Sequence, residues 1–479
     1  MDFTEIYRQT ASLVAFSPGG QFVLTAVQDR LIVRRTDTFQ ITRTWLLDPS
    51  PSPTQAAVHP KSTIKAKGAQ STTIDSWITH VGWSCDSEYI LAACAKQGVV
   101  HLMKLRDEEW SGRIDAGVEG LLKAEWAPDG RTVLCFSEWG LRLSLWSTTT
   151  GTATYIQFPI HPDKGYAFRS DGRYFVLAER HKSKDTLGIY DAVDSYKLVR
   201  HFPLPTSSLS SFSLSPTGNF IAVWEGPIEY KLHVLTLAGE MLATFSPYSD
   251  PAFGVRNVAW HPAGTFLAIA GWDDKIHILD TLSWSPVTVF ELSSRMPSGV
   301  SVWREPSKWL ETTEGRGFLS YERLRGIQSI NVTRSDQTKA SPKSGVAQLE
   351  WNVTGSLLLA RFENTPAALH IFDFPAPNQT FKPRLRSVLV NLQPILYARW
   401  NPVRKGSLAL CCGTQSVYTW SDEWLGEGGN EEEMAECIGV PAKKFETRDL
   451  RWGPDGKGFI LLGKEQFCCA FEVEGGSDI

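Results

Sequence analysis

Apolar and polar residues alternate along most of the chain in short runs, and a turn-forming phrase separates one run from the next. The phrase begins with an aromatic or aliphatic residue, passes through a turn rich in Pro, Gly, Asp, Ser and Thr, and ends in an apolar run. Examples are W-A-P-D-G-R-T-V-L from Trp126 and W-H-P-A-G-T-F-L-A from Trp260. Gly, Pro and Asp favour tight turns, and apolar residues at every second position are typical of half-buried strands. The pattern therefore predicts a succession of β-hairpins.

The phrase recurs nine times, and its first residue serves as an anchor for counting. The anchors are Phe16, Trp83, Trp126, Phe168, Leu214, Trp260, Trp351, Trp400 and Trp452. Those from Trp83 to Trp260 lie 42 to 46 residues apart, close to the ~40–45 residues of a WD-type blade. Third and fourth strand-like runs follow within a period, for example Lys275–Leu279 and Pro286–Phe290. The period predicts an all-β WD-repeat β-propeller of four-stranded blades, about nine of them, over residues 1–479.

The two ends of the chain suggest how the last blade is completed. The final period offers only three strands before the chain ends, whereas an unassigned strand, Phe3–Arg8, precedes the first anchor. We expect this N-terminal strand to complete the last blade, because that removes an exposed sheet edge. The stretch between Phe290 and Val346 has no clear anchor and could hold a degenerate blade. Two smaller propellers in series are the alternative.

Three segments interrupt the period, and we interpret them as inserted loops: residues 48–76, 305–343 and 422–441. The first is rich in Pro, Ser and Thr, the second has mixed charge, and the third is acidic and includes Glu431-Glu432-Glu433. Such compositions are typical of solvated, irregular segments. Functional alternatives are a basic arm for microtubules and an acidic partner site.

Composition limits the classes of partner and compartment. The formal net charge is −4 and the sequence pI is about 6.2, so we expect no direct binding of nucleic acid or membrane. The pairs Cys411-Cys412 and Cys468-Cys469 fall in strand-like runs, where alternation should place one thiol of each pair inward. The first residues contain no apolar run typical of a signal peptide, and we expect an intracellular protein.

Motifs for chemistry are missing from the sequence. It contains no H-E-x-x-H, C-x-x-C, G-x-S-x-G or G-x-x-x-x-G-K-[ST], and its ten histidines are scattered. We therefore expect no catalytic, cofactor-binding or metal-binding residues, and no enzyme activity. Assembly of an active site from loops of distant blades is the alternative.

The loops between the second and third strands of the blades are the candidate docking surface, because four of them place an aromatic residue beside a charge. Trp and Arg are enriched at the centres of protein interfaces. The predicted partner-binding residues are Arg30, Trp139, Arg180, Lys182, Lys184, Trp224, Trp272, Asp273 and Phe362. The alternative is that Trp139, Trp224 and Trp272 pack between adjacent blades.

Several stretches resemble one family, the WD-repeat protein eight family of centrosomes and spindle pole bodies, in its fungal form. They include M-D-F-T-E-I-Y from Met1, W-S-G-R-I-D-A-G from Trp110, G-R-Y-F-V-L-A-E-R from Gly172 and F-C-C-A-F-E from Phe467. The resemblance spans almost the whole chain and thins out in the inserts.

The resemblance implies a non-enzymatic scaffold that helps to anchor microtubule minus ends at the spindle pole body or centrosome. Its implied partners are a coiled-coil spindle-pole anchoring protein and a minus-end-directed kinesin, with microtubules reached indirectly. The implied location is the cytoplasm and cytoskeleton, at the microtubule organising centre. A propeller adaptor of a ubiquitin-ligase, chromatin or RNA-associated complex is the alternative.

Overall fold

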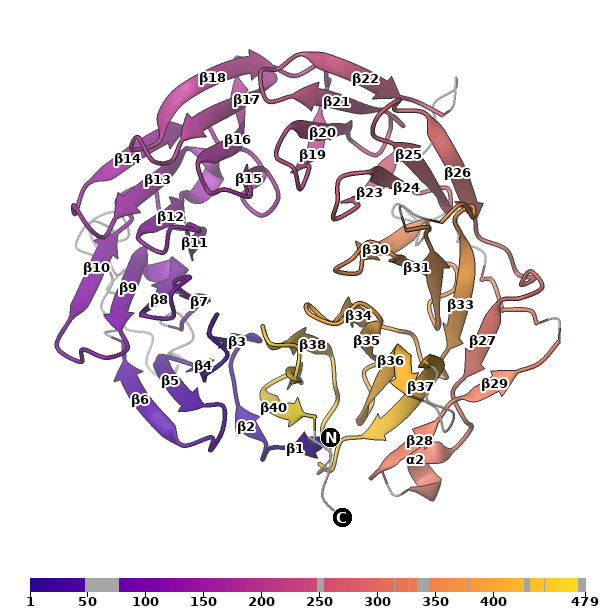
Figure 1. Ribbon diagram of the computed structural model, residues 1–479. Coiled ribbons are helices and arrows are strands. Elements are labelled where there is room, and N and C mark those ends of the chain that lie inside the picture. The colour runs from indigo at the N-terminus through magenta and orange to yellow at the C-terminus, as the bar shows by residue number, and fades with distance from the viewer. Residues whose placement is uncertain are drawn as a thin grey trace, which may run out of the picture. The chain divides into compact units, whose positions relative to one another are not determined.

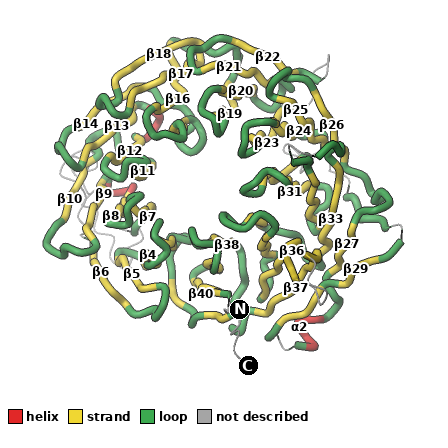
Figure 2. Tube along the Cα trace, viewed as in Figure 1, coloured by secondary structure: helices red, strands yellow, loops and turns green. Residues whose placement is uncertain are grey.

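The computed structural model describes residues 1–47, 77–247, 254–313, 315–326, 328–333, 344–376, 379–425, 431–442 and 444–472. The insert predicted at 48–76 lies outside these residues. Strands joined by loops make up nearly all of the described chain, and the helical elements are single turns such as α2 (Trp309–Thr312) (Figure 2). Within these ranges, no helix has the length and apolar character to cross a membrane.

The chain divides into two compact units, each described here by itself. The N-terminal unit comprises residues 6–204 with 465–467, and the C-terminal unit comprises 205–464 with 1–5 and 468–479. Six of the described sheets consist of four antiparallel strands in chain order, and three sheets of the C-terminal unit take in further strands from elsewhere in the chain (Figure 1). Every sheet is one propeller blade.

The N-terminal unit holds blades 1 to 4. Their strands are β3 (Val14–Phe16), β4 (Phe22–Val27), β5 (Arg30–Arg35) and β6 (Ile41–Leu46); β7 (His80–Trp83), β8 (Tyr89–Cys94), β9 (Val99–Lys104) and β10 (Ser111–Asp115); β11 (Lys123–Trp126), β12 (Thr132–Phe136), β13 (Arg142–Ser147) and β14 (Ala153–Gln157); and β15 (Tyr166–Phe168), β16 (Tyr174–His181), β17 (Lys184–Asp191) and β18 (Lys197–Pro203).

The C-terminal unit holds blades 5 to 9. Their strands are β19 (Leu209–Leu214), β20 (Phe220–Glu225), β21 (Leu232–Thr236) and β22 (Met241–Phe245); β23 (Val255–Trp260), β24 (Phe266–Gly271), β25 (Lys275–Asp280) and β26 (Pro286–Glu291); β30 (Val346–Trp351), β31 (Leu357–Phe362), β32 (Ala368–Asp373) and β33 (Arg384–Val390); β34 (Tyr397–Trp400), β35 (Ser407–Cys411), β36 (Ser416–Leu425) and β37 (Glu431–Gly439); and β38 (Asp449–Trp452), β39 (Gly458–Leu462) and β40 (Gln466–Phe471).

All nine anchors end the first strand of a blade, so the chain is an all-β, nine-bladed WD40 β-propeller, as predicted. The tryptophan anchors also link neighbouring blades. The indole Nε1 of Trp351 donates to Ala259 O at 3.1 Å, and that of Trp400 donates to Glu350 O at 3.0 Å. Trp452 Nε1 repeats the contact with Arg399 O at 3.0 Å. In each pair the acceptor is the residue before the anchor of the preceding blade.

The last blade takes its fourth strand from the start of the chain, as the sequence predicts. Strand β1 (Asp2–Phe3) pairs antiparallel with β40, with Asp2 opposite Phe471 and Phe3 opposite Ala470. Thr4 N also donates to Cys469 O at 2.9 Å. This pairing covers the edge that β40 would otherwise expose.

The prediction that residues 305–343 form an irregular loop is wrong between Trp309 and Leu324, where the chain forms a helical turn and two short strands. Strands β27 (Ser301–Arg304) and β29 (Glu322–Leu324) extend blade 7, with β27 parallel to β33, and β28 (Phe318–Ser320) extends blade 8 beside β37. Glu305 fixes the segment: its Oε1 accepts from Trp309 Nε1 at 2.7 Å and from Tyr418 Oη at 2.8 Å, and its Oε2 accepts from Leu392 N. The segment adds outer strands to existing blades and is not a degenerate blade.

The acidic segment 422–441 also differs from the solvated loop predicted for it. Most of it belongs to the β36–β37 hairpin, whose tip at 426–430 lies outside the described residues. Glu433 Oε1 accepts hydrogen bonds from Trp303 Nε1 and Trp420 Nε1, both at 2.9 Å, and from Ser387 Oγ. Three hydrogen-bond donors offset much of the free-energy cost of burying this carboxylate. Composition alone does not reveal those donors.

Both thiols of each adjacent cysteine pair are buried, although alternation predicted one inward thiol per pair. Cys411 packs with residues of blade 9, such as Leu450, whereas Cys412 packs with residues of blades 7 and 8, such as Leu389. Blade 8 is covered by blade 7 on one face and by blade 9 on the other, so strand alternation does not separate buried from exposed positions there.

Candidate functional site

The β16–β17 hairpin is the longest in the N-terminal unit. Its strands have eight residues each, whereas the second and third strands of the other three blades there have five or six. It closes on the two-residue turn Lys182-Ser183, in which both residues have positive φ, 49° and 66°. Positive φ at both central positions matches the twist of a tight hairpin. The extra length carries the predicted residues Arg180, Lys182 and Lys184, all exposed, beyond the rest of the blade.

The loop between β12 and β13 displays Trp139. Its side chain is 90% exposed, and its backbone is left-handed, with φ 61° and ψ 13°. Such a conformation costs a bulky L-residue roughly 1–2 kcal/mol and is held by its surroundings. Glu138 N donates to Glu119 O at 3.1 Å, and a Cβ at Gly140 would lie 2.7 Å from Pro159 O. The loop is wedged between two neighbouring connections, which fix Trp139 in solvent.

Trp139 belongs to a group of exposed apolar side chains on adjoining segments of blade 3. We call this group the blade 3 rim: Val118, Leu122, Trp139, Leu141 and Phe158. Phe158 N donates to Leu141 O at 3.0 Å, and Arg180 N donates to Phe158 O at 3.0 Å. The rim therefore adjoins the basic β16–β17 hairpin. Exposed apolar groups gathered in one place mark interaction sites, whereas single ones do not.

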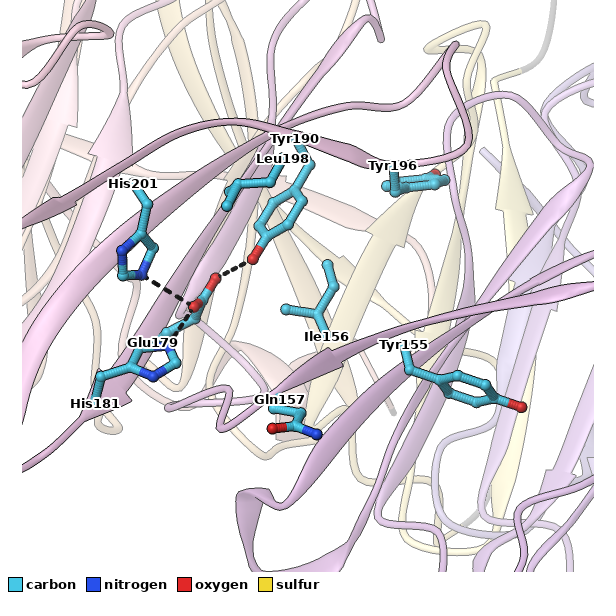
Figure 3. Close-up of a pocket in the computed structure, with 9 residues that line it drawn as sticks. All are labelled: Tyr155, Ile156, Gln157, Glu179, His181, Tyr190, Tyr196, Leu198 and His201. Carbon is cyan, nitrogen blue, oxygen red and sulfur yellow. Dashed lines mark hydrogen bonds and ion pairs between the residues drawn. The ribbon is translucent and has the colours of Figure 1, made fainter.

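A groove of about 490 Å³ lies between the outer strands of blades 3 and 4 (Figure 3). Its lining residues are Tyr155, Ile156, Gln157, Glu179, His181, Tyr190, Tyr196, Leu198 and His201. At its base the Glu179 carboxylate accepts from Tyr190 Oη at 2.5 Å, and its second oxygen faces His181 Nε2 at 2.8 Å and His201 Nε2 at 3.3 Å. Burial, with the bond to Glu179, raises the pKa of Tyr190 and keeps its hydroxyl a donor. These three side chains have the composition of a metal-binding group, which the scattered histidines of the sequence did not suggest, and the absence of a metal site stays a prediction.

Sequence reasoning placed His181 beside the predicted residues but missed Glu179 and His201. Glu179 and His181 are two apart in β16, so strand alternation puts them on one face. His201 lies opposite Gly188 in the β17–β18 register, two strands away from Glu179. The E-x-H spacing is therefore visible in the sequence, whereas the third member depends on strand register.

Arg30 begins β5 and is exposed, as its predicted role requires. It lines a second depression of about 270 Å³ together with Arg8 and Arg34. The Arg34 guanidinium also stacks over the Tyr7 ring, 4.6 Å from its centroid. Arg30 is thus the outer member of a basic pocket in blade 1.

Trp224 and Phe362 are buried, so the prediction that their side chains bind a partner is wrong. Trp224 is 7% exposed and packs with Tyr230, Leu232 and Trp260 between blades. Phe362 is 1% exposed, with its ring 5.1 Å from that of His370. Both residues end a second strand, where the neighbouring blade still covers the side chain.

Trp272 and Asp273 are intermediate, since both are half-buried. The Arg256 guanidinium lies 4.4 Å from the Trp272 ring centroid, and Arg256 Nη2 pairs with Glu363 Oε1 at 2.9 Å. Asp274, the next residue, accepts from Gly345 N of blade 7 at 2.9 Å. This turn links blades 6 and 7. Of the three tryptophans in question, Trp139 is the one that protrudes.

The chain is similar to known WD-repeat proteins over its whole length. The family described as WD domain, G-beta repeat matches residues 239–280, which include the anchor Trp260. The mouse protein WD repeat-containing protein WRAP73 is 30% identical over 98% of this chain and 96% of its own. A WD repeat-containing protein of Schizosaccharomyces pombe is 19% identical over 99% and 93%. Among solved structures, the C-terminal WD40 domain of Sif2 covers 92% of this chain and 99% of its own, at 10% identity and a TM-score of 0.49.

Proposed function

This chain belongs to the family of the WD repeat-containing protein WRAP73, and we propose that it is a non-enzymatic scaffold whose blade 3 rim binds a partner protein. The observation that carries the proposal is Trp139, an aromatic side chain held almost fully in solvent by a left-handed loop. An exposed Trp in a fixed conformation loses little entropy on binding and buries a large area. Loops on a rigid scaffold commonly carry binding residues.

The charges around the rim favour an acidic, amphipathic segment as the partner. Lys182 and Lys184 are exposed beside the rim, and neither of them has an ion-pair partner among the described residues. Arg180 is 48% exposed while its Nε bonds Asp185 Oδ1 at 2.8 Å. An apolar centre flanked by cations suits a helix that has an apolar stripe and acidic flanks, as coiled-coil proteins have.

We further infer that this partner is a coiled-coil spindle-pole protein and that the complex helps to anchor microtubule minus ends, together with a minus-end-directed kinesin. The support for this finer role is the resemblance of the stretches at Met1, Trp110, Gly172 and Phe467 to the centrosomal and spindle-pole family. We accordingly propose a location in the cytoplasm, at the spindle pole body or centrosome.

The experiment is affinity purification from dividing cells, followed by mass spectrometry and by titration of the recovered partner. Trp139→Ala should weaken binding by about 30-fold, which corresponds to about 2 kcal/mol for the loss of a central aromatic anchor. Lys182→Glu with Lys184→Glu should slow association, and more so at low salt.

Trp424→Ala is the matched control, because Trp424 is also exposed but lies on β36 of the C-terminal unit. We expect it to leave affinity unchanged within about twofold. Equal binding by Trp139→Ala and the wild type would remove the rim as the site. Recovery of ligase or ribonucleoprotein subunits without any spindle-pole protein would contradict the cellular role.

A further inference from the structure

Three metal-ligating side chains converge at the base of the groove between blades 3 and 4 (Figure 3). Their ligand atoms are Glu179 Oε2, His181 Nε2 and His201 Nε2, which all lie within 4.8 Å of one another. The Glu179 side chain is 3% exposed, whereas those of His181 and His201 are 40% and 33% exposed. The cluster therefore has a buried base and an open outer side.

The fold builds this cluster through the absence of one side chain. Gly188 of β17 lies opposite Leu177 of β16 on one side and His201 of β18 on the other. A Cβ at Gly188 would overlap Glu179 Oε1 and lie 2.6 Å from the Tyr190 ring. Because Gly188 has none, the Glu179 carboxylate crosses β17 and reaches His201. A blade with an alanine at this position could not hold the same arrangement.

The His201–Glu179 distance equals that between two ligands of a small transition-metal ion, whereas the His181–Glu179 distance is that of a hydrogen bond, which an ion would have to replace. Zinc binds imidazole nitrogen and carboxylate oxygen at roughly 2.0–2.2 Å, so tetrahedral ligand atoms lie roughly 3.3 Å apart. His201 Nε2 lies 3.3 Å and His181 Nε2 lies 2.8 Å from Glu179 Oε2. Two imidazoles with one carboxylate favour zinc or a related ion over magnesium or calcium, which prefer oxygen ligands throughout.

The surroundings leave the outer side of the cluster open and hold the Glu179 carboxylate in place. Tyr190 Oη donates a hydrogen bond to Glu179 Oε1 and so orients the carboxylate, as outer-shell donors do at metal sites. The Phe158 ring meets the His181 ring edge-on at 5.9 Å. Arg180, the neighbour of both ligands in β16, is bound to Asp185.

We propose that Glu179, His181 and His201 bind one divalent transition-metal ion, of which zinc is the first candidate. The ion takes three ligands from blade 4, and its fourth position opens toward solvent. Water or a side chain of a bound protein fills that position. The site is separate from the docking role of Trp139, and each can fail without the other.

The test is calorimetric titration of zinc chloride into untagged protein that has been treated with a chelator. The eight cysteines all lie in described residues and Cys85 alone is exposed, so a Cys85→Ser background removes the competing thiol. Cobalt substitution should give the visible absorption of a low-symmetry site. We expect one ion per chain, and thermal stabilisation by zinc.

Three variants distinguish a metal site from a cluster in which Glu179, His181 and His201 only bond to one another. His201→Gln should lower the zinc affinity by at least about 100-fold, and Gly188→Ala, which alters no ligand, by about 10-fold or more. His80→Gln makes the same exchange in blade 2 and should change affinity less than about twofold. Circular dichroism confirms that each variant is folded. No binding by the folded wild-type protein, or equal binding by His201→Gln, overturns the proposal.

Discussion

Replacing Trp351 by phenylalanine tests whether the anchor indoles hold the blades together. Trp351 is buried, its Nε1 donates to Ala259 O of blade 6 at 3.1 Å, and its ring packs 4.5 Å from Phe374 and 4.9 Å from His261. Phenylalanine keeps a ring in the site but removes the donor. Natural anchors at Phe16 and Phe168 show that the position accepts this ring.

The expected cost has two parts. The hydrogen bond contributes about 1 kcal/mol net, and a buried carbonyl left without its partner costs a further 1–2 kcal/mol or so. The smaller ring also leaves part of the pocket empty, which adds to the cost. We expect Trp351→Phe to lower the free energy of unfolding by about 2–3 kcal/mol.

Urea unfolding followed by far-UV circular dichroism measures this difference, since tryptophan fluorescence would change with the substitution itself. Hydrogen exchange should also increase in β23 and β30, the two strands that the indole links. Trp139→Phe is the matched control: the same atoms are removed from an exposed indole, so the change should stay within about 0.5 kcal/mol. Equal midpoints for Trp351→Phe and the wild type would refute the role of the indole bond.

Two further substitutions test buried polar groups of the C-terminal unit. Burial lowers the pKa of His370 to about 4. As the pH falls below about 6.5, the unfolded chain therefore takes up a proton before the folded chain does, and the free energy of unfolding decreases. His370→Leu should remove up to about 3 kcal/mol of this loss, measured from the urea midpoints at pH 7 and pH 4.5. Glu305→Ala should lower the free energy of unfolding by about 3 kcal/mol or more and expose the following segment to proteolysis, because it leaves Trp309 Nε1 and Tyr418 Oη without their acceptor. Glu305→Gln should recover only part of this stability, because its amide nitrogen cannot accept the hydrogen bond from Leu392 N.

The turn chemistry and its period made the blades predictable. Each anchor phrase combines turn residues with an apolar run, and both signals are local, so all nine first strands end where the sequence predicts. The segment 301–324 lacks that local signal. Its strands form because the outer edges of β33 and β37 supply hydrogen-bond partners, and those edges are far away in the sequence.

The fate of the loop aromatics could not be predicted, because the same local pattern leads to three outcomes. Trp139, Trp224 and Trp272 each stand beside a charged residue, yet one protrudes, one is buried and one lies half-covered under Arg256. The outcome depends on what the adjoining blade or connection presents. For Trp139 that is the pair of connections on either side of its loop, which hold the backbone in a conformation that leaves the ring in solvent.

Blade 4 buries a carboxylate, Glu179, where apolar packing could fill the same space. Burying Glu179 costs free energy that its partners must offset, and replacing such a network by apolar residues is often neutral or stabilising. Stability alone therefore does not account for Glu179, Gly188 and Tyr190 together. The proposed metal site would account for them, since a bound ion would fix His181, whose ring meets that of Phe158 in the blade 3 rim edge-on. If zinc binds and also alters the affinity of the partner, the groove and the rim act as one surface; if the two titrations are independent, the contact between His181 and Phe158 is packing alone.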